Sequence, residues 1–341
     1  MSPAPAVLLG DPAHFHIRAG ANPHTRDPLG RRKQVDRSKA IAQWTDLKLI
    51  LEHHGVKVHS IPPVEEEPGL VFPANAGFRC GDQFFLSNLN RARAGERDHY
   101  RRCISALGLE VKDLPSQYPF EGEADFIPVG DPSGDPEKTV YLFTHGRIER
   151  QRWVPRLGIP PYRRVYGFRS DRRVLEALES IVRPREVLPL ELIDEAHYHG
   201  DTVLCSFGPH RELLLAYLDG LAGEARLALH RWFGDRLIPL SRLDGRRFAA
   251  NSFQVTPWYQ GEPRRVLIMP DGLTDEAYRK VRAREVIPCP VDTSEFLEKG
   301  GGAVKCMLLD LTGSPLTGSD PFQGRSPLKW GQTPSGFGTC T

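Results

Sequence analysis

Several features that would assign a chain to a particular class of protein are missing from these 341 residues. No apolar run approaches the roughly 20 residues that a membrane-spanning helix needs. We also expect no signal peptide, because no charged segment precedes a long apolar stretch at the N-terminus. The 45 Lys and Arg residues nearly balance the 43 Asp and Glu residues, which leaves a formal net charge of +2. Such an even balance predicts neither nucleic acid nor a membrane surface as the partner.

Cysteine is scarce and shows no pattern that would organise a fold. The six residues form neither a CxxC pair nor a dense disulfide framework: Cys80, Cys103, Cys205, Cys289, Cys306 and Cys340. A reducing, cytoplasmic setting is therefore expected, with most of these thiols buried and inert. The chain also lacks a strand-linked GxGxxG, a Walker sequence and a GxSxG elbow, which argues against nucleotide binding and serine hydrolase chemistry.

What the chain does contain is an alternation of short apolar strands and amphipathic helices. The strands are expected at Ala6–Gly10, Lys57–Ile61, Gln83–Ser87, Thr139–Thr144, Thr202–Phe207, part of Phe248–Val255, Arg265–Met269 and Val304–Leu311. The helices are expected at Ser38–His54, Arg97–Leu107, Arg172–Ile181, Arg211–Leu221, Thr274–Arg282 and Ser294–Glu298. This recurrence predicts an α/β fold of repeated βαβ-like modules.

The clearest helix should begin at Ser38 as its cap and bury one apolar face, made of Ile41, Trp44, Leu47 and Leu51. From Thr312 onward, Gly, Ser and Pro replace the periodic pattern, so we expect a loosely packed or disordered tail.

A glycine run, Gly300 to Gly302, precedes Cys306 and the expected strand Val304–Leu311. Glycines let the backbone approach a ligand closely, and a cysteine at the start of a strand can face a cavity. An inert strand cysteine is the plainer interpretation, because reactivity requires a base or a cation near the sulfur. Cys306 is thus a candidate nucleophile only if such groups lie beside it.

A second cluster, His197 to Thr202, offers those groups. In an extended segment His199 and Asp201 point to the same side, which places an acid/base next to a carboxylate. The alternatives are a surface turn or a metal site, and the metal site is disfavoured because His197 and His199 lack a further cluster at ligand spacing.

Two more clusters carry polar groups in an apolar setting. Glu121, Glu123 and Asp125 lie between Phe120 and Phe126 and suit a delocalised cation, although an acidic surface loop would look the same. Asn75 stands in the small apolar segment Val71 to Gly77, for which an ordinary Asn-containing turn is the alternative.

Together, in this order, the four clusters resemble the guanidine-modifying enzyme (pentein) superfamily. The superfamily comprises arginine deiminases, dimethylarginine dimethylaminohydrolases, arginine dihydrolases and amidinotransferases. The resemblance runs from about His14 to Leu311 and is strongest to the arginine dihydrolase and dimethylargininase branch. The segments that match this branch are Ala21–Pro23, Ala42–Trp44, Phe72–Gly77, Tyr166–Ser170 and the single residue Asn251. The resemblance implies one catalytic domain, residues 1–312, folded as a five-bladed pseudo-symmetric α/β propeller with the site in its central channel, followed by a tail of residues 313–341.

The resemblance also implies roles for individual residues. Cys306 would attack the guanidinium carbon, His199 would protonate the leaving amine and then activate water, and Glu121 and Asp201 would hold the guanidinium nitrogens. The remaining positions carried over as substrate-binding are Asn22, Asn75, Asp125, Asn251 and Arg169, the last for a substrate carboxylate.

Four departures from the branch bear on these roles. Glu121 and Asp125 stand four apart rather than three, so Glu123 competes with Glu121 for the catalytic role. Gly200 replaces a leucine. Asn88 stands where relatives commonly carry an arginine for the substrate carboxylate, which leaves Arg91 or Arg93 to substitute. The segment 146–164 is an apparent insertion near the entrance.

The function implied is cysteine-dependent hydrolysis of the guanidino group of arginine or a modified arginine through an S-alkylthiouronium intermediate. Amidino transfer to an amine and non-catalytic guanidinium binding are the alternatives. This chemistry requires no cofactor or metal, and the expected partner is a small molecule. Assembly into a homodimer is left open.

Overall fold

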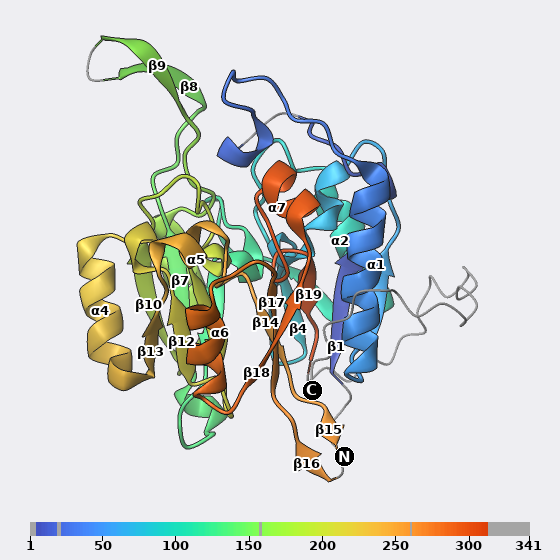
Figure 1. The fold of residues 1–341 in the computed structure, drawn as a ribbon, viewed down its shortest axis with the longest axis vertical. Helices are drawn as coiled ribbons and strands as arrows, with labels where there is room; N and C mark the ends of the chain where they lie inside the picture. Colours follow the sequence, from blue (N-terminus) through green and yellow to red (C-terminus); the bar gives the residue numbers. More distant parts are fainter. Residues whose placement is uncertain (1–4, 19–21, 157–158, 260, 313–341) are drawn as a thin grey trace.

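A computed structural model describes residues 5–18, 22–156, 159–259 and 261–312, so the predicted tail after Thr312 lies outside the described residues. These residues form five three-stranded sheets of one design (Figure 1). In each sheet the middle strand pairs antiparallel with one neighbour and parallel with the other.

The five sheets, each with its middle strand in second place, are β19 (Leu308–Asp310), β1 (Ala6–Gly10) and β2 (Lys57–Ile61); β3 (Gly77–Cys80), β4 (Gln83–Leu86) and β5 (Glu110–Asp113); β6 (Phe126–Val129), β7 (Val140–His145) and β10 (Glu186–Glu191); β11 (Leu204–Phe207), β12 (Leu213–Ala216) and β13 (Leu237–Pro239); and β14 (Phe253–Val255), β17 (Val266–Pro270) and β18 (Ile287–Val291). The first sheet brings together the first and last strands of the described chain, because β19 pairs with β1.

Each parallel pair is joined by a helix, as parallel pairing requires a crossover. The five crossover helices are α1 (Arg37–His53), α2 (Glu96–Ala106), α3 (Leu175–Val182), α4 (Gly223–Phe233) and α6 (Asp275–Arg282). Two short helices, α5 (Arg242–Arg246) and α7 (Ser294–Gly300), lie between modules. The middle strands β1, β12 and β17 are buried along their whole length. The predicted α/β alternation is therefore confirmed.

One leucine-rich segment that predicts a helix forms a strand instead. The helix predicted at Arg211–Leu221 is wrong, because its apolar centre forms the buried middle strand β12. Leucine favours helices, but a four-residue apolar run covered on both faces suits a central strand. The true crossover helix, α4, follows at Gly223 and was not predicted.

Smaller corrections concern the cap and the buried face of α1 and the residue at which β19 begins. The cap of α1 is Asp36, whose side chain accepts a hydrogen bond from the Lys39 amide, and not Ser38. Its buried stripe includes Leu47 and Leu51, whereas Ile41 is 44% exposed. The strand predicted from Val304 begins only at Leu308, so Cys306 lies in a turn instead of a strand.

The apparent insertion forms a separate hairpin of β8 (Arg152–Arg156) and β9 (Ile159–Val165), which projects from the body (Figure 1). A second small hairpin pairs β15 (Trp258–Tyr259) with β16 (Glu262–Pro263). Within the described ranges, no helix is long and apolar enough to cross a membrane.

Candidate active site

Residues from distant parts of the chain line one open cavity of about 130 Å³. Six of the predicted site residues contribute to its lining: Asn22, Asn75, Glu121, Arg169, His199 and Cys306. Their positions follow from the repeated fold, because a site residue precedes the strand that starts each sheet. Asn75 precedes β3, Glu121 precedes β6, His199 precedes β11, and Cys306 precedes β19.

The fifth equivalent position is held by Asn251, which precedes β14 and fixes the cysteine. Its Oδ1 accepts hydrogen bonds from the amides of Ala303 (2.9 Å) and Cys306 (3.2 Å). Its Nδ2 donates to the sulfur of Cys306 at 3.1 Å. Gly301, which caps α7 with φ +79°, lets the chain turn into this arrangement. Asn251 therefore anchors the turn of Cys306 and solvates its sulfur.

Asp201 lies against the same sulfur. The thiol of Cys306 donates to Asp201 Oδ2 at 3.1 Å, and both residues are buried. Burial and the Asp201 carboxylate raise the pKa of the Cys306 thiol well above its usual range, although Asn251 and the charge of Lys305 act in the opposite direction. The cysteine is consequently a neutral thiol at neutral pH, and a cation brought next to the sulfur would favour its ionisation.

His199 and Glu121 form the opposite part of the site. His199 Nε2 lies 2.8 Å from Glu121 Oε2 and 3.3 Å from Asn75 Nδ2. Burial alone would raise the pKa of Glu121, but the hydrogen bond and charge of His199, with the charges of Arg93 and Arg169, lower it to about 2. Glu121 is thus a buried carboxylate that remains charged, next to an imidazole that lines the cavity.

The predicted extended geometry of the histidine segment is wrong. Gly200–Thr202 forms a 3-10 helix with His199 as its N-cap. The loop is held by Asp125, which accepts from the Gly200 amide (2.9 Å), from Thr144 Oγ1 (2.7 Å) and from Ser170 Oγ (2.6 Å). Burial raises the pKa of Asp125 to about 6 against these hydrogen bonds and the charge of His199. Asp125 does not contribute to the cavity lining and contacts protein groups.

The two competing glutamates face different surroundings. Glu121 lines the cavity with His199, whereas Glu123 pairs with Lys305 at 2.5 Å and lines a second cavity. The geometry thereby favours Glu121 over Glu123 as the carboxylate of the site. Asp201 also contributes to the lining of the second cavity and not the first.

Of the two arginines that could substitute for the one missing at position 88, Arg93 lines the cavity and Arg91 does not. Asn88 donates its side chain to the carbonyls of Ser116 and Tyr118 and is outside the cavity lining, as is Arg91. Arg93 lines the cavity and donates to Asn75 Oδ1 at 2.6 Å. It also forms a two-pronged ion pair with buried Glu96, at 2.8 and 2.6 Å. Arg93 therefore orients Asn75 as well as adding positive charge.

The two remaining predicted residues of the cavity lining are Asn22 and Arg169, and both contact Tyr198. Asn22 donates to the Gly300 carbonyl at 2.8 Å and to the Tyr198 hydroxyl at 3.1 Å. Arg169 stacks over the Tyr198 ring, with its guanidinium carbon 4.9 Å from the ring centre.

The sequence analysis missed Asn90 and Glu96. Asn90 donates to Glu121 Oε1 at 2.6 Å, and Glu96 neutralises Arg93. The only sequence signal for Glu96 is its spacing from Arg93, three residues earlier, at the start of α2. In the described part of the chain, no group of three His, Cys, Asp or Glu side chains could hold a metal ion.

This architecture matches that of α/β proteins that modify guanidines. The chain is 29% identical over 312 residues, 89% of its length, to the bifunctional arginine dihydrolase/ornithine cyclodeaminase AgrE of Nostoc sp., and covers 37% of that protein. It is 27% identical over 301 residues to N(G),N(G)-dimethylarginine dimethylaminohydrolase of Mycobacterium tuberculosis, covering 88% of the chain and 83% of that protein. No family model matches.

A solved structure supports the same relationship. The complex of an AgrE mutant with L-arginine aligns with a TM-score of 0.73 and 27% identity, over 91% of this chain and 40% of that one. The chain thus spans little more than a third of the length of its cyanobacterial relatives. Its homologues are arginine dihydrolases and a dimethylarginine dimethylaminohydrolase, and the predicted resemblance to the guanidine-modifying enzymes is confirmed.

Proposed function

We propose that this protein hydrolyses the guanidino group of arginine or a modified arginine, with Cys306 as a covalent nucleophile. The observation that carries the proposal is the convergence of a thiol, an imidazole and two carboxylates at one buried place. Asp201 contacts the sulfur, and Glu121 contacts His199. One carboxylate beside the imidazole in the cavity lining and one beside the sulfur suit a planar cation whose nitrogens spread over two directions.

In this mechanism, binding of the cation favours transfer of the thiol proton from Cys306 to neutral His199, which lines the same cavity, because the positive charge stabilises the adjacent thiolate. Glu121 and Asp201 hold guanidinium nitrogens so that the central carbon faces the sulfur. The Sγ–C bond forms, and protonated His199 gives its proton to the departing amine as the C–N bond breaks.

The second half-reaction uses the same imidazole as a base. Neutral His199 removes a proton from water, whose oxygen attacks the S-alkylthiouronium carbon. Collapse of the adduct expels the sulfur of Cys306 and leaves a ureido product. A second round of attack on that product would give ornithine. Asn22, Asn75 and Arg169 line the cavity and are proposed to bind the substrate, Arg169 through a carboxylate.

Asp125 and Asn251 take different parts in this proposal. Asn251 acts on the nucleophile, through its contacts with the sulfur and the turn of Cys306. Asp125 acts on the general acid, because it holds the amide of Gly200 next to His199.

We further infer that the five like sheets are the blades of a propeller around the site. The support is that each blade contributes, just before its first strand, a residue that lines or holds the site. The catalytic domain would then comprise residues 1–312. A cytoplasmic location is proposed because no disulfide joins the described cysteines to one another, as expected in a reducing compartment.

The test compares Cys306→Ala with Cys103→Ala, a buried thiol in α2 distant from the cavity lining. Each is incubated with arginine and with methylated arginines, with and without an amine acceptor, and the products are identified by mass spectrometry. Cys306→Ala should be inactive with an unchanged melting temperature, and Cys103→Ala should be active. Full turnover by Cys306→Ala would refute the proposal, and an amidino product formed only with the acceptor would show a transferase.

A further inference from the structure

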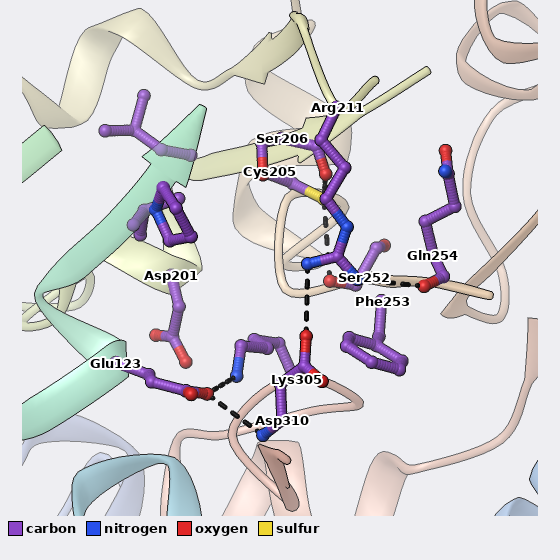
Figure 2. Close-up of a pocket in the computed structure, with 13 residues that line it drawn as sticks. Glu123, Asp201, Cys205, Ser206, Arg211, Ser252, Phe253, Gln254, Lys305 and Asp310 are labelled. Carbon is purple, nitrogen blue, oxygen red and sulfur yellow. Dashed lines mark hydrogen bonds and ion pairs between the residues drawn. The ribbon is translucent and has the colours of Figure 1, made fainter. Parts of the chain in front are cut away.

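A second cavity, of about 60 Å³, lies next to the turn that carries Cys306 (Figure 2). Cys306 and His199 are absent from its lining. The charged side chains that line it are three carboxylates and two cations: Glu123, Asp201, Asp310, Arg211 and Lys305. The proposed mechanism uses only Asp201 among them, so this charged cluster calls for its own explanation.

Lys305 directly precedes the nucleophile in the turn, yet its side chain faces this second cavity. Its Nζ donates to Glu123 Oε2 at 2.5 Å and to the Leu308 carbonyl at 3.4 Å. Its backbone amide donates to the Asn251 carbonyl at 3.2 Å. The turn of Cys306 is therefore held by a half-buried ion pair on the side away from the substrate cavity.

Glu123 extends this attachment to both sides of the cysteine. The same oxygen that accepts from Lys305 also accepts from the Asp310 amide at 3.1 Å. Two residues earlier in the chain, Glu121 binds His199. Glu123 and Lys305 thus join the loop that carries the general acid's partner to the turn that carries the sulfur.

Asp201 connects the second cavity to the chemistry. Its Oδ2 accepts from the thiol of Cys306, whereas its buried Oδ1 has no hydrogen-bond partner among the residues that the structure describes. Figure 2 shows the Asp201 carboxylate turned toward the ammonium of Lys305. In a buried setting, a nearby ammonium stabilises the charged form of a carboxylate and of a thiolate.

We propose that Lys305 and Glu123 are positioning residues, which together hold the turn of Cys306. The ammonium of Lys305 supplies the positive charge behind Asp201 and the sulfur. The inference rests on the proposed function for its effect on turnover. Its effect on the reactivity of the thiol does not depend on the substrate.

The experiment uses Lys305→Met, Glu123→Gln and the double variant, with Arg211→Gln as the matched control. Arg211 lines the same cavity, but its guanidinium donates to Asp310 Oδ2 (3.1 Å) and to the Gln254 carbonyl, outside the turn 304–307. For each variant, kcat and KM are measured with arginine. The rate of alkylation of Cys306 by iodoacetamide is measured as a function of pH by peptide mass spectrometry, together with the melting temperature.

The two single substitutions should change the alkylation rate of the Cys306 thiol in different ways. Lys305→Met removes the cation and leaves Glu123, so the alkylation rate at pH 8 should fall about tenfold and the profile should move to higher pH. Glu123→Gln keeps the cation, so alkylation should not slow. Both should lower kcat about tenfold or more with KM changed less than about threefold, since an interaction that acts on the reacting group affects mainly kcat.

The double variant should fall between the singles in alkylation rate, because both charges are gone. Arg211→Gln should leave the alkylation profile unchanged. If Lys305→Met shows the alkylation profile of Arg211→Gln and differs only in melting temperature, the pair is merely structural and the inference is overturned. If alkylation shifts as expected but no guanidine is turned over, the proposed function fails and the positioning role stands.

Discussion

At the scale of the residue, the site depends on one amide that contacts both the sulfur and the backbone of the nucleophile's turn. Asn251 accepts from two backbone amides with one end and donates to the Cys306 sulfur with the other. Asparagine supplies an acceptor and a donor without charge, which neither aspartate nor alanine can do. The sequence identified Asn251 only through its resemblance, as a substrate-binding position. Its contacts in the fold are with the turn and the sulfur of Cys306, the proposed nucleophile.

The matched pair Asn251→Asp and Asn251→Ala separates these two contacts. Asp keeps the acceptor for the turn but removes the donor and adds a negative charge beside the sulfur. We expect Asn251→Asp to lower kcat about 100-fold, because a charge-assisted hydrogen bond to the thiolate is lost, with a small change in melting temperature. Asn251→Ala should also lower the melting temperature, since two buried amides lose their acceptor.

Stopped assays and thermal melts of both variants supply the readouts. If Asn251→Asp is as active as the unchanged protein, the amide does not stabilise the thiolate.

At the scale of the element, the histidine loop shows how packing decides what a sequence departure means. Gly200 stands where the resembling branch has leucine. In the fold, a Cβ at Gly200 would lie 2.2 Å from Thr144 Oγ1. The glycine is needed because β7 passes closely under the loop. The segment is thereby tightened, and it positions His199.

We therefore expect Gly200→Ala to cost about 1–3 kcal/mol of stability, because the added methyl group overpacks the contact. Activity should fall with it, since the loop that bears His199 must shift. Thr144→Ala combined with Gly200→Ala should be less destabilised than the sum of the two single changes, as expected of residues in contact. Urea unfolding measures all three.

Gly223→Ala serves as the control, because no heavy atom lies within 4 Å of a Cβ at that position. Equal losses at Gly200 and Gly223 would contradict the packing argument.

At the scale of the whole molecule, the repetition of one sheet design determines where the site residues lie. Each of the five sheets begins with a strand preceded by one member of the site, as Asn75, Glu121, His199, Asn251 and Cys306 show. The hairpin β8–β9 is outside this design, because its two strands pair only with each other. It follows β7 and returns shortly before Arg169, at the edge of the cavity.

Replacement of residues 150–163 by a short Gly-Ser linker should consequently leave cooperative melting intact. The reason is that none of the five sheets loses a strand and the hydrophobic clusters keep their members. We expect kcat to stay within about threefold, while KM changes more, because the linker alters the approach to Arg169. Calorimetry and steady-state kinetics test this. Loss of a cooperative transition would show that the hairpin is an integral part of the fold.

The amino-acid sequence by itself determined the alternation of elements. The spacing of apolar residues identifies eight of the fifteen strands in the five sheets, and the resemblance selected Cys306, His199 and Glu121, which the fold brings to one cavity. Tertiary structure alone decided which of Glu121 and Glu123 faces the histidine, that Arg93 lines the cavity where Asn88 does not, and that Leu213–Ala216 is a strand. The physical reason is that periodicity reports burial, whereas the direction of a side chain in a turn is set by partners far away in the sequence, 78 residues for Glu121 and His199 and 182 for Glu123 and Lys305.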